Sequence, residues 1–228
     1  APYSSEHTIV TGNTCTGNNA GLGDCGVDGM IATNNNFSEN NYGVIISPGT
    51  VLAYPGSRGR LQCNIIAKNA KHGVYYNSTT EQRDGEYQID SNTIRDNGED
   101  GINLKAPGQE VRSMFIQGND VYRNGRHGLN LEDGTAINMD VVNNRFWNNG
   151  LTASGNGINL APEVKISSFS ANKIRDIQST PTQQYPVYAS GTLTDVDISF
   201  NHCVGNAQNT LNLTGTQTRV TTLNNPGI

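Results

Sequence analysis

The sequence predicts an all-β fold, a right-handed parallel β-helix (solenoid) of about eight three-strand coils, and three observations support this prediction. A motif of Asn, Gly and Leu recurs almost letter for letter in Asn92 to Leu104 and in Asn119 to Leu131. Weaker copies at spacings of 22 to 29 residues cover the rest of the chain, and such a period indicates a repeat architecture. The apolar residues of each copy alternate with a period of two, which is typical of strands.

Each copy of the repeat contains three short strand segments. One apolar residue stands three positions before the first Asn, another stands two positions after it, and a third segment follows, such as GMIA in the first copy and GINLK in the middle. A unit of this length cannot bury its apolar side chains alone, but stacked units form three parallel sheets around one core. We take the coil as right-handed because parallel crossovers are almost always right-handed.

The first Asn of each copy predicts a stacked asparagine ladder. The copies align on Asn13, Asn35, Asn64, Asn92, Asn119, Asn144, Asn172 and Asn201. Asn tolerates the left-handed conformation that a sharp corner requires, and its amide can bond to the Asn of the next copy. We expect one β-helix domain over residues 1–228, and its unfinished ends favour a segment of a larger protein.

Composition limits the class of protein. Only 15% of the residues are charged and the net charge is -5, which argues against nucleic-acid binding because that function favours a basic surface. No apolar run approaches the roughly 18 residues that cross a bilayer, so no membrane partner is expected. Cys15 and Cys25 flank a loop of the first copy. The sequence leaves open whether these two residues form a disulfide or remain free thiols.

The repeated unit also carries a family resemblance. The pattern Asn-x-apolar-x-x-Asn-Gly-x-x-Gly-apolar-x-apolar, clearest in residues 92–104 and 119–131, resembles the right-handed parallel β-helix superfamily. That superfamily includes pectate lyases, mannuronan C5-epimerases and bacteriophage tailspike depolymerases. The resemblance covers essentially the whole chain and implies a polysaccharide partner laid along one sheet, an extracellular, secreted or virion-surface location, and a homotrimer as one assembly.

Candidate site residues emerge when the copies are compared column by column, because equivalent residues of successive coils lie about 4.8 Å apart. The predicted catalytic residues can each transfer a proton and lie on one strand face: His72, Tyr75, Asp100 and His127. The predicted substrate-binding residues are charged, amide and phenolic side chains of the same strands: Lys71, Asn103, Lys105, Arg126, Asn130, Glu132, Asn159 and Tyr188.

These residue types suit the removal of a proton next to a uronate carboxylate. Such a lyase or epimerase needs a base, a proton donor on the other side, and a cation such as Lys71, Lys105 or Arg126. A hydrolase needs two carboxylates about 5 to 9.5 Å apart. Counting along the strand places Glu132 about 16 Å from the Asp100 column, which is too far for these two carboxylates to act as a hydrolase pair. The function expected is lyase- or depolymerase-type processing of an acidic extracellular or capsular glycan.

An alternative function fits the same columns. Lys71, Glu99 and Arg126 alternate in charge up the stack, as do the residues of the His72 column, and such pairs can simply stabilise strand register. The column of Asn103, Asn130 and Asn159 could contact sugar hydroxyls or form a further amide ladder. The chain could therefore be a non-catalytic carbohydrate-binding module or a structural solenoid stalk of an oligomeric tailspike, so enzymatic activity is favoured but left open.

No cofactor is predicted, and one metal is conceivable. Acidic solenoid grooves can bridge calcium to a uronate, and the ligands would then be Asp24 and Asp28, or Asp133. No residues have the spacing of a dedicated metal motif. The sequence identifies neither the glycan nor the oligomeric state.

Overall fold

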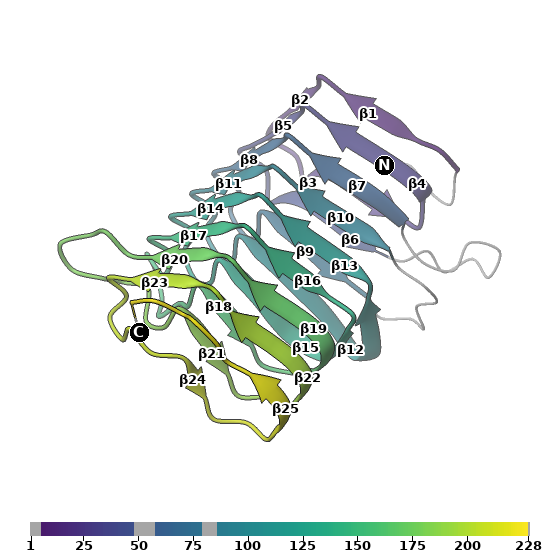
Figure 1. Cartoon of the computed structure of the whole chain (residues 1–228). Helices are drawn as coiled ribbons and strands as arrows, with labels where there is room; N and C mark the ends of the chain where they lie inside the picture. Colours follow the sequence, from purple (N-terminus) through teal and green to yellow (C-terminus); the bar gives the residue numbers. More distant parts are fainter. Residues whose placement is uncertain (1–5, 48–57, 79–85, 228) are drawn as a thin grey trace.

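The structure of the chain, a computed structural model, describes residues 6–47, 58–78 and 86–227. Over these residues the chain winds into a coil whose strands lie one above the next, without any helix (Figure 1). Strands of successive coils pair in parallel, as Thr93–Arg95 does with Asp120–Tyr122. The predicted all-β parallel solenoid is therefore confirmed.

The strands form three stacks that run the length of the coil. The first stack contains β1 (Ile9–Thr11), β4 (Asp28–Thr33), β7 (Arg58–Gln62), β10 (Tyr87–Asp90), β13 (Met114–Gln117), β16 (Asp140–Val142), β19 (Glu163–Ser170), β22 (Leu193–Ser199) and β25 (Gln217–Thr221). The second stack contains β2 (Thr14–Cys15), β5 (Asn36–Phe37), β8 (Ile65–Ala67), β11 (Thr93–Arg95), β14 (Asp120–Tyr122), β17 (Arg145–Trp147), β20 (Lys173–Arg175) and β23 (His202–Val204). The third stack contains β3 (Ala20–Cys25), β6 (Tyr42–Ser47), β9 (Val74–Asn77), β12 (Ile102–Arg112), β15 (Leu129–Ile137), β18 (Ile158–Leu160), β21 (Val187–Ala189) and β24 (Asn212–Leu213).

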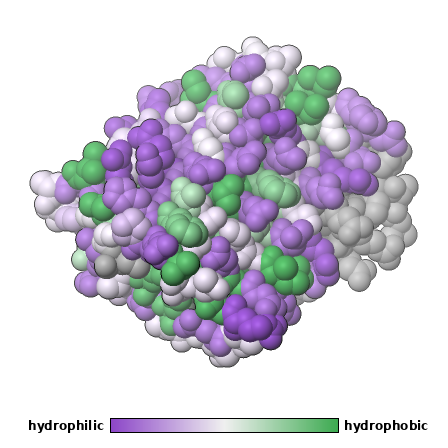
Figure 2. Space-filling model, viewed as in Figure 1, coloured by the Kyte–Doolittle hydropathy of each residue, from purple (hydrophilic) through white to green (hydrophobic). Residues whose placement is uncertain are grey.

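The core lies inside these three stacks. Alternate residues of each strand point inward, so one column of the second stack, from Ile94 through Val121 and Phe146 to Ile174, is fully buried. The outward surface is mostly polar on the face shown in Figure 2. The period-two burial explains why the short apolar segments of each repeat form strands.

The predicted asparagine ladder is confirmed. The backbone N–H and the side-chain amide of Asn92 both donate to Asn119 Oδ1 at 3.0 Å, and the same amide donates to the Leu61 carbonyl at 2.9 Å. One side chain thus joins three coils, which satisfies buried polar groups at a corner where no sheet pairing exists. The ladder runs through Asn13, Asn35, Asn64, Asn92, Asn119, Asn144, Asn172, Asn201 and Asn225.

A second ladder stands at the next corner, and the sequence reasoning did not predict it. It uses the second Asn of the repeat, so that Asn97 Nδ2 donates to Asn124 Oδ1 at 2.9 Å and Asn124 Nδ2 to Asn149 Oδ1 at 3.0 Å. Gln183 continues this ladder in place of an asparagine and donates to Asn206 Oδ1 at 2.6 Å. The longer side chain bridges the insertion that precedes β21.

The expected left-handed conformation of the ladder asparagines is wrong. The left-handed residue is the one before each ladder Asn, for example Cys63 (φ 54), Ser91 (φ 56) and Ala171 (φ 55). This placement turns the chain first, so that the Asn that follows can point inward and bond along the stack. Asn is therefore selected here for its amide and not for its backbone freedom.

Steric contacts require glycine at the position that begins the third strand. A Cβ at Gly101 would lie 2.7 Å from the Gly128 carbonyl oxygen and 2.9 Å from Asn124 Nδ2. Only glycine therefore lets the third stack begin this close to the second asparagine ladder.

The first coil departs from the predicted alignment. Its third strand is β3, Ala20–Cys25, whereas the segment around Met30 belongs to β4 of the first stack. In the third stack Ala20 pairs with Tyr42, so Asp28 is not a neighbour of the His72 column. The short first repeat misled the alignment because its Gly-rich stretch resembles a loop.

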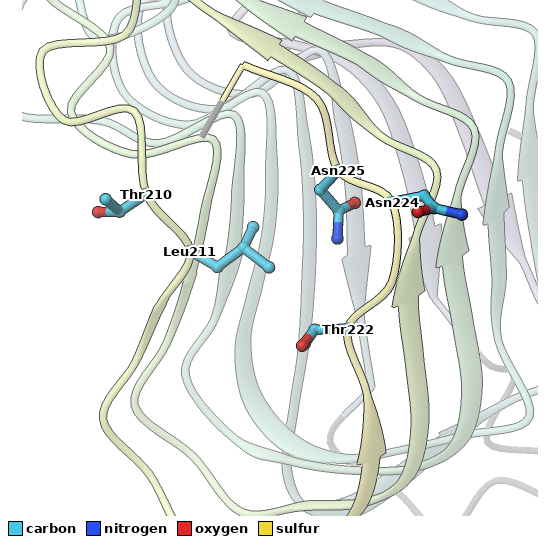
Figure 3. Close-up of a pocket in the computed structure, with 5 residues that line it drawn as sticks. All are labelled: Thr210, Leu211, Thr222, Asn224 and Asn225. Atoms are coloured by element: carbon cyan, nitrogen blue, oxygen red, sulfur yellow. The ribbon is translucent and has the colours of Figure 1, made fainter.

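All four cysteines are free, so no disulfide joins Cys15 and Cys25. Figure 3 looks into the last coil, where the side chains of Leu211 and Asn225 point toward the hollow of the coil. No helix formed by the described residues is long and apolar enough to span a bilayer.

Candidate functional site

Most of the predicted site residues lie together on the third stack, on strands β9, β12 and β15 and on the turns before them, whereas Asn159 and Tyr188 lie on β18 and β21 of the same stack. The register places Tyr75 beside Asn103, Asn103 beside Asn130, and Asn130 beside Asn159. The predicted column alignment is therefore correct from β6 onward as far as Leu131, but a register shift then pairs Lys105 with Asp133 and not with Glu132 as predicted. Tyr188 pairs with Asn159 and lies at the far end of the same column.

Asp100 is the centre of the cluster, fully buried at 0% exposure and hydrogen-bonded at both carboxylate oxygens. Arg126 from the next coil donates through Nε to Oδ1 at 2.8 Å and through Nη2 to Oδ2 at 2.5 Å. The His127 backbone N–H donates a further hydrogen bond to Asp100 Oδ1 at 2.9 Å. Burial is the largest single influence and would raise the pKa of Asp100, but the hydrogen bond from Arg126, its positive charge and the hydrogen bond from Asn103 act together with the neighbouring His127 to lower this pKa to about 2.

The amides of the neighbouring strands complete this enclosure. Asn103 Nδ2 lies 2.7 Å from Asp100 Oδ2, and Asn130 Nδ2 lies 3.0 Å from the same oxygen. Asn159 Nδ2 donates in turn to Asn130 Oδ1 at 2.8 Å. These three asparagines are buried and form an amide ladder that supports Asp100; within the described residues, Asn103 Oδ1 is buried without a hydrogen-bond partner.

Glu132 lies much closer to Asp100 than strand counting predicts, so the separation of about 16 Å is wrong. One nitrogen, Asn103 Nδ2, donates to Asp100 Oδ2 at 2.7 Å and to Glu132 Oε2 at 2.8 Å. Lys105 Nζ holds the other Glu132 oxygen at 2.5 Å. Burial would raise the pKa of Glu132, but the hydrogen bond from Lys105 lowers it, so both facing carboxylates are ionised at neutral pH.

His72 is occupied at both ring nitrogens. Its Nε2 lies 3.0 Å from Glu99 Oε2, and its Nδ1 accepts the Asp100 backbone N–H at 3.3 Å. The ring is 6% exposed, and burial lowers its pKa despite the nearby carboxylates. His72 is therefore a neutral imidazole that links two coils and supports the side chains packed on it.

His127 has the same backbone contact but keeps one nitrogen available. Its Nδ1 accepts the Asn156 backbone N–H at 2.9 Å, which leaves the proton on Nε2. Among the described residues, Nε2 has no hydrogen-bond partner. Burial lowers the pKa of His127 to about 4, so near neutral pH this residue offers a neutral N–H donor.

Aromatic side chains cover one end of the cluster. Tyr75 stacks against both Tyr42 and His72, with ring centroids at 5.2 and 5.0 Å, and the Tyr42 and His72 rings lie 6.0 Å apart, so the three rings form a triangle. Lys71 Nζ donates to the Tyr42 hydroxyl at 3.1 Å, and this hydrogen bond raises the pKa of Lys71. Burial raises the pKa of Tyr75, so its phenol is protonated at neutral pH. Tyr42 was not predicted as a site residue, although it occupies the column of His72.

Tyr188 lies apart from this cluster. It stacks on Tyr185 with ring centroids 5.8 Å apart, at the other end of the column. The predicted substrate-binding residues therefore extend over one strand face from Lys71 to Tyr188, with the charged groups in the middle and a tyrosine pair at each end.

The carboxylates considered for calcium do not converge. Asp24 accepts the Val27 N–H at 3.0 Å, Asp28 pairs with Arg58 at 3.2 Å, and Asp133 accepts the Gly134 N–H at 2.8 Å. Within residues 6–47, 58–78 and 86–227, no three His, Cys, Asp or Glu side chains gather as a metal site. Calcium stays a prediction without a ligand set in the described structure.

Comparison with known proteins defines the family. A family model described as the right-handed beta helix region matches residues 26–226. The match covers most of the chain, so the chain belongs to this family, and the predicted resemblance and right-handed coil are confirmed. No curated protein sequence matches the chain significantly.

Two solved structures share the fold. The mannuronan C-5 epimerase AlgE6 A-module of Azotobacter vinelandii matches 98% of this chain and 60% of its own length, with a TM-score of 0.70 and 18% identity. The AlgE4 A-module of the same organism matches 95% of this chain and 59% of its own length, with a TM-score of 0.66 and 17% identity. The chain thus spans about 60% of the length of either module. At this identity the likeness establishes the fold alone.

Proposed function

We propose that the chain is a polysaccharide-processing β-helix domain that acts on an acidic glycan by a lyase- or epimerase-type removal of the proton next to a uronate carboxylate. The observation that carries this proposal is the meeting of a protonated phenol, Tyr75, and a neutral N–H donor, His127, with the Asp100–Glu132 cluster on one strand face. Proton abstraction next to a carboxylate needs a base, a donor and stabilisation of the developing negative charge.

Lys71 is the cation best placed to receive the uronate. Arg126 and Lys105 are held by Asp100 and Glu132, whereas Lys71 bonds to the Tyr42 hydroxyl and forms no ion pair among the described residues. A ligand carboxylate can therefore approach Lys71 without breaking an existing pair. Neutralising that carboxylate lowers the cost of placing a second negative charge on the same sugar.

The remaining groups have distinct proposed roles. His127 Nε2–H stabilises the charge that develops on the carboxylate, because a neutral imidazole can polarise an oxygen without losing its own proton. Tyr75 supplies a proton to the opposite side of the reacting carbon or to the leaving oxygen. Glu132, which is ionised and less enclosed than Asp100, accepts the proton; Asp100 and His72 are positioning residues.

The electrostatics disfavour a glycosidase. Hydrolysis by paired carboxylates requires one of them to be protonated as the general acid. Arg126 lowers the pKa of Asp100 to about 2, and Lys105 lowers the pKa of Glu132. The two carboxylates are therefore close enough to act together but lack the protonated partner.

The solved structures support this proposal at the level of substrate class. Both similar modules are named mannuronan C-5 epimerases, and mannuronan is an acidic polysaccharide. A domain that processes such a polymer would act where the polymer occurs, so we propose an extracellular, secreted or virion-surface location. A homotrimer is proposed on the tailspike resemblance alone.

A non-catalytic function is the second candidate, and one observation favours it. Every carboxylate of the cluster is already paired inside the chain, Asp100 with Arg126, Glu132 with Lys105 and Glu99 with His72. Such pairing is also what a register-stabilising column requires. In that case this strand face of the third stack would bind a glycan without turnover, or would only stabilise the coil.

Turnover of a polyuronate tests the proposal. We expect the wild-type chain to form unsaturated ends or altered C5 stereochemistry, and Lys71→Gln to lower turnover at least about tenfold, roughly 1.4 kcal/mol. Lys68→Gln is the matched control, since Lys68 lies three positions away and faces Glu39 at 4.0 Å. Shortening of the polymer without either product would instead indicate hydrolysis, and binding without turnover would support the second candidate.

A further inference from the structure

A second group of side chains, on a different stack from the candidate site, has the composition of a ligand-binding surface. We call it the aromatic-arginine strip: Tyr122, Arg145, Trp147, Lys173 and Arg175. These residues point outward from β14, β17 and β20 of the second stack, which lie one above the next in Figure 1. The candidate site lies on β9, β12 and β15 of the third stack.

The aromatic rings of the strip are stacked and fixed in place. Tyr122 and Trp147 lie 4.3 Å apart between ring centroids, at an interplanar angle of 19°. The indole N–H of Trp147 donates to Asp120 Oδ1 at 2.7 Å, which holds the ring orientation. The guanidinium groups of Arg145 and Arg175 lie 5.7 and 6.0 Å from the Trp147 ring centroid.

The strip contains cations without partners. Arg145 faces Asp120 at 3.5 Å, but Lys173 and Arg175 form no ion pair among the described residues. Within the part of the chain that the structure describes, Arg175 Nε is also buried without a hydrogen-bond acceptor, which is costly. This local excess of positive charge occurs in a chain whose net charge is -5, so it is not a general property of the surface.

We propose that the aromatic-arginine strip binds a uronate-bearing polysaccharide, as a second surface separate from the candidate site. The faces of Trp147 and Tyr122 are covered by each other and by arginines, so sugar rings would contact the partly exposed ring edges. Guanidinium groups bind carboxylates in a planar, two-bonded geometry. Asp120 reduces the positive field, and only two cations are unpaired. The strip therefore suits the single charge per ring of a uronate better than the dense charge of a sulfated glycan or a nucleic acid. This inference does not depend on catalysis at the first site.

The single tryptophan of the chain makes the strip directly observable. Trp147 is the only Trp, so its intrinsic fluorescence reports on the strip and on no other place. We expect a saturable fluorescence change with oligouronate, weakened by salt, and none with a neutral glucan of equal length. Lys173→Gln should weaken the oligouronate Kd about threefold, and Lys173→Gln with Arg175→Gln about tenfold or more. Lys68→Gln, which removes a lysine outside the strip, should leave the Kd unchanged.

Three results would overturn the inference. A fluorescence that does not respond to oligouronate would show that the strip is structural. Tighter binding of a sulfated oligosaccharide or of single-stranded oligothymidylate would show that the ligand class is wrong. Loss of the titration in Lys71→Gln would show that fluorescence reports binding at the candidate site. If the chain shows no polyuronate turnover but the fluorescence titration succeeds, only the proposed function is contradicted. The two proposals can therefore fail independently.

Discussion

Arg126 holds the Asp100 carboxylate of the preceding coil through two hydrogen bonds, Nε to Oδ1 at 2.8 Å and Nη2 to Oδ2 at 2.5 Å. Since Asp100 is fully buried, this pair is the electrostatic centre of the candidate site. It keeps a buried carboxylate ionised and so fixes the amides of Asn103 and Asn130, and the Asn103 amide in turn orients Glu132.

Removing the guanidinium should therefore destabilise the coil. We expect Arg126→Gln to lower the free energy of unfolding by about 3 kcal/mol, because Asp100 would remain buried without its charge partner. Urea unfolding measures the change. Arg219→Gln serves as the control, since Arg219 pairs with Asp195 at the surface and its loss should change stability by less than about 1 kcal/mol. Equal effects of both variants would contradict the buried-pair interpretation.

Acidification should destabilise the chain before Asp100 is protonated. The pKa of His127 falls from an ordinary 6.5 to about 4 on folding, so the folded chain disfavours the imidazolium. The stability that this residue contributes is complete above pH 6.5 and is lost as the pH falls toward 4, by about 3 kcal/mol. Unfolding measured across this range should show a smaller loss for His127→Asn. An unchanged pH slope would show that His127 titrates normally.

The second asparagine ladder should contribute to stability mainly in its interior. Asn124→Ala removes an amide bonded to Asn149 and leaves buried polar groups unpaired in neighbouring coils, so we expect a loss of about 2 to 3 kcal/mol. Asn18→Ala removes the exposed first member of the same ladder and should cost about 1 kcal/mol or less. Thermal unfolding compares the two variants. A similar cost at both positions would indicate that ladder bonding is not the cause.

The left-handed corners allow a stabilising substitution. Ala171 has φ 55, a conformation that costs an L-residue about 1 kcal/mol. Ala171→Gly should therefore raise the free energy of unfolding by a few tenths to 1 kcal/mol, after the greater chain entropy of glycine is included. Ala70→Gly, at an exposed position that is not among the left-handed residues, should lower it. Destabilisation by both changes would mean that the corner at Ala171 is not strained.

The fold was largely predictable because its signals are local and repeated. The Asn, Gly and apolar residues of segment 92–104 recur in the next coil. Each has one steric or hydrogen-bonding role, and this role is the same in every coil of the stack. The second ladder could also have been predicted, since Asn97 and Asn124 belong to the same pattern. The conformation of the corner could not, because the left-handed position holds Gly or Asn in some coils and Cys, Ser, Ala or Phe in others, so no single residue type marks it.

The candidate site was only partly predictable. Column alignment correctly brought together the residues of β9, β12 and β15, because register follows from the repeat. The closeness of Glu132 and Asp100 was missed, since counting along a strand measures backbone separation and ignores the reach of Glu132 and the bridging amide of Asn103. The roles of His72 and His127 also depend on which backbone N–H meets each Nδ1, which a sequence does not show.

The central claim is that the chain removes the proton from the carbon that bears the uronate carboxylate. The most direct measurement is incorporation of deuterium at C5 of a polyuronate incubated with the chain in heavy water, followed by NMR or mass spectrometry. We expect deuterium at C5, or an unsaturated product that has lost the C5 hydrogen, with the wild-type chain, and at least tenfold less with Tyr75→Phe or Glu132→Gln. A polymer that binds the chain but retains all of its C5 hydrogen would contradict the proposed chemistry.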